Sequence, residues 1–115
     1  MADLKLDTRR LADVTLLGLN GYINAHTVKE FETYLVQLLE GGDCRIIING
    51  KGLQYIASAG LGALMGVIED IREKQGDIRL CELSPSVYEV FDILGFTHLF
   101  RIFPTEEEAV RSFSD

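Results

Sequence analysis

The feature that most constrains this chain is the change of hydrophobic period on either side of Ser58. Residues 44–49 form a short β-branched run that is typical of a buried strand. Downstream of the serine, apolar side chains recur at helical spacing as Leu61, Leu64, Met65, Ile68 and Ile71. The pattern predicts a helix that begins within a residue or two of Ser58 and leaves the serine hydroxyl in solvent. Leu61, Leu64 and Ile68 are expected to face a sheet.

Ser58 has two interpretations at this position. A serine hydroxyl at a helix start can accept a hydrogen bond from a free backbone N–H of the first turn, which is a structural role. A phosphate on the same hydroxyl would be stabilised by those N–H groups and by the positive end of the helix dipole. The flanking residues Ala57, Ala59, Gly60 and Gly62 are small and leave room for a partner's active site. Position alone favours the capping role.

The remaining pattern alternates between strand and helix. Strands are expected at residues 4–7, 14–19, 78–81 and 100–102, and Gly21 breaks the pattern after the second of them. A helical stripe from Val28 to Leu39 ends at Gly41 and Gly42. Ser84 and Pro85 start a third helix that Gly95 ends, and Thr105 with Glu108 forms a capping box for a terminal helix.

This order of elements predicts the fold class. Strand, strand, helix, strand, helix, strand, helix, strand, helix indicates an α/β protein with one mixed sheet of about five strands, covered by about four helices. A length of 115 residues is typical of one domain, which we expect to span residues 1–115.

Composition excludes several function classes. The net charge is −7 and the basic residues are scattered, so nucleic acid is not an expected direct partner. No apolar run approaches the ~20 residues of a membrane-spanning helix, so no membrane insertion is expected. Residues 1–5 have no signal-peptide character, which predicts a cytoplasmic protein.

The chain offers little for a metal, a cofactor or catalysis. Cys44 and Cys81 form no C-x-x-C pair, and we expect buried, reduced thiols. His26 and His98 have no ligand spacing, and the glycines after Ser58 do not form a dinucleotide fingerprint. His26 is the only candidate base near the serine turn, and no third orienting acid is evident. We therefore expect no metal, no cofactor and no enzymatic activity.

Three segments together resemble the STAS domain of anti-sigma factor antagonists. They are residues 55–64 around the serine, residues 21–24 before the first helix, and residues 83–96 across the third helix. The resemblance covers nearly the full chain. By position, the family's regulatory phosphorylation site is Ser58.

The resemblance implies a switch between protein partners. An anti-sigma factor that is also a serine kinase of the histidine-kinase-like ATPase class phosphorylates the serine, and a PP2C-type phosphatase removes the phosphate. Only the unphosphorylated form binds the anti-sigma factor. This binding frees a sigma factor for transcription. Two turns that follow neighbouring strands are expected to form the partner-binding surface: Asn24, His26 and Thr27 from one, and Tyr55, Ala57, Ser58, Ala59, Gly60 and Leu61 from the other.

Two positions depart from the family pattern. The family's aspartate before the phosphoserine is Ala57 here, and its aspartate in the turn before the first helix is Asn24. Both replacements fall on the surface that engages the kinase in phosphorylated members. The alternative function is a non-phosphorylated STAS adaptor, either a subunit of an ABC lipid transporter or part of a signalling scaffold.

Overall fold

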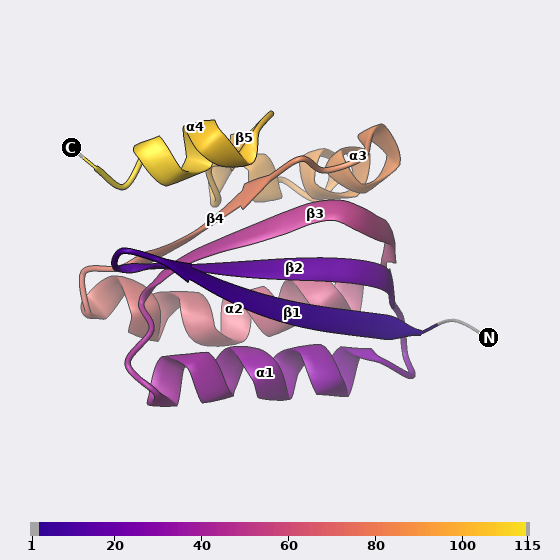
Figure 1. Cartoon of the computed structure of the whole chain (residues 1–115). Coiled ribbons are helices and arrows are strands. Elements are labelled where there is room, and N and C mark those ends of the chain that lie inside the picture. The colour runs from indigo at the N-terminus through magenta and orange to yellow at the C-terminus, as the bar shows by residue number, and fades with distance from the viewer. Residues whose placement is uncertain (1–2, 115) are drawn as a thin grey trace.

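The computed structural model describes residues 3–114 as alternating strands and helices (Figure 1). The elements are β1 (Leu4–Leu11), β2 (Val14–Ile23), α1 (Val28–Glu40), β3 (Arg45–Ile56), α2 (Ser58–Glu73), β4 (Asp77–Cys81), α3 (Pro85–Ile93), a 3₁₀ turn (Phe96–His98), β5 (Ile102–Phe103) and α4 (Glu106–Arg111). The predicted order of elements is confirmed.

The five strands form one mixed sheet in the order β1-β2-β3-β4-β5. The strand β1 pairs with β2 in an antiparallel ladder, whereas the pairs β2–β3, β3–β4 and β4–β5 are parallel. The carboxyl ends of the parallel strands β2, β3 and β4 therefore lie at the same end of the sheet, and α1, α2 and α3 each begin there. The fold-class prediction is confirmed.

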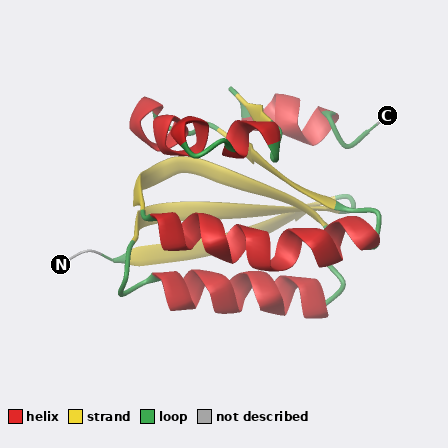
Figure 2. Ribbon diagram, turned by 180° about the vertical axis from the view of Figure 1, so that it is seen from behind, coloured by secondary structure: helices red, strands yellow, loops and turns green. Residues whose placement is uncertain are grey.

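Alternation along the strands divides the core between the two faces of the sheet. In β3, Ile46 and Ile48 join a large apolar cluster with residues of α1, α2 and α3, whereas Ile47 joins a smaller cluster with Ala109 of α4. Figure 2 shows α1 and α2 in front of the strands, and Figure 1 shows α4 on the opposite side of the molecule from α1. We call these two sides the α1/α2 face and the α4 face.

The strands differ from the predicted ones mainly in length. The first strand continues to Leu11, β2 passes through Gly21 to Ile23, and β3 extends from Arg45 to Ile56. Gly21 has φ +117° and lies at a register shift between β2 and β3, so it bends the strand without ending it. The last strand is Ile102–Phe103, so the prediction at residues 100–102 was one to two residues early.

The helix boundaries follow local capping chemistry. Ser84 accepts a hydrogen bond from the backbone N–H of Val87, at 3.3 Å, and Thr105 accepts one from that of Glu108, at 3.2 Å. Both predicted caps are confirmed. Within residues 3–114, no helix has the length and apolar character needed to cross a membrane.

The two cysteines are free, but they differ in burial. Cys81 is fully enclosed, and burial raises the pKa of its thiol to about 12. Cys44, directly before β3, is only half-buried, so the expectation of a buried thiol is confirmed for Cys81 and wrong for Cys44.

Candidate partner-binding surface

A backbone hydrogen bond joins the two turns that the sequence singled out. The N–H of Ala57, directly after β3, donates to the carbonyl oxygen of Ile23 at the end of β2, at 2.8 Å. The parallel register continues to this point, with Ile23 opposite Ile56. Residues 24–27 and residues 57–59 therefore leave the sheet side by side.

Ser58 is the first residue of α2 and is exposed. The N-cap residue is Ala57, with the extended backbone that the N-cap position requires (φ −79°, ψ 159°), but this helix start has no side-chain cap hydrogen bond. The helix begins where the sequence predicts. The capping role that position alone favoured for Ser58 is wrong, because the serine lies one residue beyond the N-cap.

The charge environment of Ser58 is favourable for an anion. The first turn of α2 contains no acidic side chain, whereas the first turn of α1 contains Glu30 and that of α4 contains three glutamates. The partial positive charge at the start of this 16-residue helix is therefore uncompensated by its own first turn. A phosphate on Ser58 would lie against it.

In the neighbouring turn, Asn24 has a structural role. Its Oδ1 atom accepts hydrogen bonds from the backbone N–H groups of His26, at 2.9 Å, and Thr27, at 3.2 Å. The Thr27 hydroxyl donates to the carbonyl oxygen of Tyr22, at 2.7 Å, and accepts from the Asn24 N–H, at 2.9 Å. Thr27 is buried, so its predicted place on the partner-binding surface is corrected: its side chain holds the turn from inside.

Gly60 and Leu61 are also buried, and their prediction as surface contacts is corrected in the same way. They follow Ser58 by two and three residues, which turns them to the side of α2 that packs on the sheet. Leu64 and Ile68 lie on that side too, so the prediction that Leu61, Leu64 and Ile68 face the sheet is confirmed.

One exposed residue was missed as a surface contact. Met65 falls in the apolar stripe of the sequence, but the structure leaves its side chain 43% exposed. It lies seven residues after Ser58, and Gly62 lies four after it, so the three share one side of the helix. That spacing is the signal that could have found Met65.

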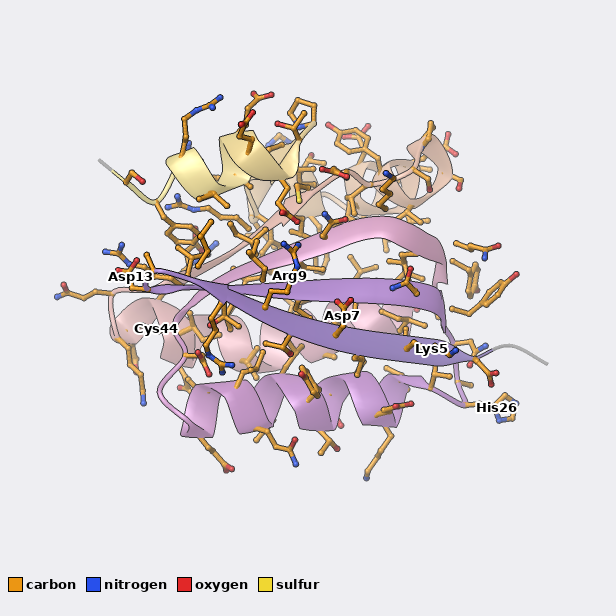
Figure 3. All side chains as sticks on the ribbon, in the orientation of Figure 1. Lys5, Asp7, Arg9, Asp13, His26 and Cys44 are labelled. Atoms are coloured by element: carbon orange, nitrogen blue, oxygen red, sulfur yellow. The ribbon has the colours of Figure 1, made fainter. Side chains whose placement is uncertain are left out.

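The exposed and half-exposed residues define what we call the Ser58 surface: Asn24, His26, Tyr55, Ala57, Ser58, Ala59, Gly62 and Met65. Tyr55 is 49% exposed at the end of β3 and supplies aromatic contact area. Figure 3 shows the His26 side chain projecting outward from its turn at the margin of the molecule. The arrangement suits recognition by another protein.

The comparison with known families is decisive for classification. The sequence model of the STAS domain family matches residues 5–109 of this chain. The chain belongs to the STAS-domain family. Within this STAS domain, the Ser58 surface lies at the end of the sheet where β2 and β3 terminate.

Relatives of this STAS domain carry regulatory names. BtrV of Bordetella bronchiseptica, assigned as an anti-sigma factor antagonist, is 33% identical over 110 residues, covering 96% of this chain and 95% of the relative. The anti-sigma F factor antagonist of Paenibacillus polymyxa is 25% identical, covering 98% and 95%. The Bacillus protein SpoIIAA has the same fold: its unphosphorylated form has a TM-score of 0.79 at 24% identity, covering 92% of this chain and 93% of that one.

Proposed function

We propose that this STAS domain is an anti-sigma factor antagonist. In its unphosphorylated form it binds an anti-sigma factor through the Ser58 surface and so frees a sigma factor for transcription. The observation that carries the proposal is the exposed Ser58 at a helix start with no acidic side chain in its first turn and only Ala57 and Ala59 beside it. The names of the relatives BtrV and anti-sigma F factor antagonist support it.

The proposed partner is a serine kinase of the histidine-kinase-like ATPase class. It transfers the γ-phosphoryl group of ATP to Ser58 Oγ, and a PP2C-type phosphatase removes that group by hydrolysis. These reactions take place in the cytoplasm. The STAS domain is the substrate of both enzymes and is not itself an enzyme. A phosphorylated form is known for SpoIIAA, which shares the fold.

The phosphate acts as a switch through its charge. It adds about −1.5 to −2 charges at neutral pH, and a charge that loses water at an interface without a partner costs several kcal/mol. A cost of about 2–4 kcal/mol lowers the affinity for the anti-sigma factor by roughly 30- to 700-fold. The same charge does not weaken the fold, because it lies at the positive end of α2.

The test is incubation of the whole chain with its cognate anti-sigma kinase and Mg-ATP. We expect one phosphoryl group by intact mass, located at Ser58 by peptide mapping, and loss of binding in calorimetry once it is added. Ser58→Ala abolishes the modification. Ser86→Ala is the matched control, because Ser86 is also an exposed serine in the first turn of a helix. Modification of any other residue, or equal binding of both forms, contradicts the switch.

A second candidate function is favoured by the absence of carboxylates at Ala57 and Asn24. Phosphorylated members of the family that the sequence resembles have aspartates at these two positions. It is a non-phosphorylated adaptor subunit of an ABC lipid transporter or of a signalling scaffold. Ser58 would then be a contact residue only. Stable binding to such a partner, with no phosphorylation by the kinase, would favour the adaptor.

A further inference from the structure

The outer edge of β1 is open. Within residues 3–114, this eight-residue strand lies at the end of the sheet and pairs with β2 alone. It contains neither proline nor glycine, and its edge is therefore a continuous template for another strand.

The hydrogen-bond pattern shows which backbone groups point outward. The N–H of Tyr22 donates to the carbonyl oxygen of Asp3, at 2.9 Å, so the backbone of Asp3 points toward β2 and is hydrogen-bonded to it. Bonding alternates along an antiparallel ladder, and the backbone groups of Leu4, Leu6 and Thr8 consequently point away from β2. An incoming antiparallel strand must bond to these three residues.

The side chains of β1 are sorted by charge. Leu4 and Leu6 pack on the apolar core of the α1/α2 face, and the Thr8 hydroxyl contacts that of Tyr34 in α1. Lys5, Asp7 and Arg9 are exposed on the other face, where Figure 3 shows them in a row along the strand. Their charges alternate in sign, and the exposed Asp3 precedes them.

We propose that β1 pairs with β1 of a second copy of this chain, antiparallel, about a twofold axis at Leu6. In this register Leu6 lies opposite Leu6 of the partner subunit, and Leu4 lies opposite Thr8 of the partner subunit. On the α4 face, Lys5 lies opposite Asp7 of the partner subunit, and Asp3 lies opposite Arg9 of the partner subunit. The twofold axis repeats both ion pairs, so four pairs of opposite charge form.

Neighbouring registers are less favourable. An axis at Asp7 places Asp7 opposite Asp7 of the partner subunit and Lys5 opposite Arg9 of the partner subunit, so both kinds of facing charged pair repel. An axis at Lys5 places like charges opposite each other in the same way, and an axis at Thr8 leaves only the pairing of Asp7 with Arg9 of the partner subunit. The axis at Leu6 is the complementary one.

The geometry of the ladder strengthens this selection. Lys5 and Asp7 fall at the positions that are not hydrogen-bonded to the incoming strand, where facing side chains approach most closely. Arg9 already donates to Glu106, at 2.7 Å, but a guanidinium has five N–H donors and can serve a second carboxylate. The pairing does not involve Ser58. The dimer proposal can therefore be tested independently of the proposed function, and failure of one does not imply failure of the other.

The experiment is sedimentation equilibrium of the whole chain over a concentration series, with charge variants of β1. Wild type is expected to show a reversible monomer–dimer equilibrium. Lys5→Asp and Asp7→Lys each replace two attractive pairs by repulsive ones, and each should weaken self-association at least tenfold. An equimolar mixture of the two variants restores complementary pairs and should dimerise, as should the double variant Lys5→Asp/Asp7→Lys. Lys74→Asp, the same charge change at the exposed end of α2, is the control.

Amide hydrogen exchange of the wild type gives a second readout that needs no variant. On raising the concentration, the N–H groups of Leu6 and Thr8 should gain protection, whereas those of Lys5 and Asp7, which already bond to β2, should not change. A wild type that is monomeric throughout with unchanged exchange overturns the proposal. So does a dimer that all of the β1 charge variants retain, because its interface lies elsewhere.

Discussion

Gly60 lies directly against Ile23, although the two belong to different elements. A Cβ atom added to Gly60 would be 2.8 Å from Cγ2 of Ile23 and 2.8 Å from Cγ1 of Ile56. The first turn of α2 thus lies on the carboxyl ends of β2 and β3 with no space for a methyl group. This contact positions the exposed Ser58 two residues before it.

Gly60→Ala should therefore destabilise the fold. Both isoleucines are buried and cannot move aside cheaply, so we expect a loss of about 1–3 kcal/mol in the free energy of unfolding. Urea denaturation measures it. Gly62→Ala is the control: nothing lies within 4 Å of its added Cβ, and the helix should gain about 0.5–1 kcal/mol. Equal effects of the two substitutions would contradict the close packing at Gly60.

Ser58→Asp should weaken binding to the anti-sigma factor at least tenfold and leave folding within about 1 kcal/mol of wild type, because an acid in the first turn favours the helix. Ser58→Ala should preserve both, since Ser58 is not the N-cap residue. Calorimetric titration and thermal midpoints of the three forms separate binding from stability. Equal affinities would assign Ser58 to the adaptor function.

Ala57→Asp should stabilise the protein. Ala57 already has the extended backbone of an N-cap residue but no side-chain acceptor, so a carboxylate there can accept from the free N–H groups of the first turn. The expected gain is about 0.5–2 kcal/mol at neutral pH. It should disappear on acidification, as the carboxylate becomes protonated. Chemical denaturation at neutral and acidic pH tests this, and an unchanged stability at neutral pH would refute the cap geometry.

Glu106 should make stability depend on pH. Burial acts to raise the pKa of its carboxyl, but hydrogen bonds from Asn49 and Arg9, together with the charge of Arg9, outweigh burial and lower this pKa below its usual value. A depressed pKa contributes stability above the unfolded-state pKa of about 4.3, and that stability is lost as the pH falls through the folded-state pKa.

Glu106→Gln should accordingly lower the free energy of unfolding at neutral pH by about 0.5–1.5 kcal/mol and flatten its decline in acid. Glu107→Gln is the control on the same helix, because Glu107 is 84% exposed and pairs only at 3.9 Å with Arg111. Denaturation curves across the acidic range measure both. A decline as steep in Glu106→Gln as in wild type would show that other carboxylates govern it.

Local chemistry allowed much of this to be predicted from the sequence. Changes of period and capping residues such as Ser84 and Thr105 act over a few neighbouring residues, so they specified the order of elements, the start of α2 at Ser58 and the starts of α3 and α4. The STAS resemblance added the candidate site.

The tertiary structure decided what depends on distant neighbours. The extension of β3 to Ile56 comes from pairing with β2, which no local pattern encodes. Packing of α2 on the sheet enclosed Gly60 and Leu61 and turned Met65 outward, although all three look like ordinary helix residues in the sequence. Likewise, β1 became an open edge only through the strand order. Exposure and pairing are properties of the assembled sheet, because each depends on which segments come together across the chain.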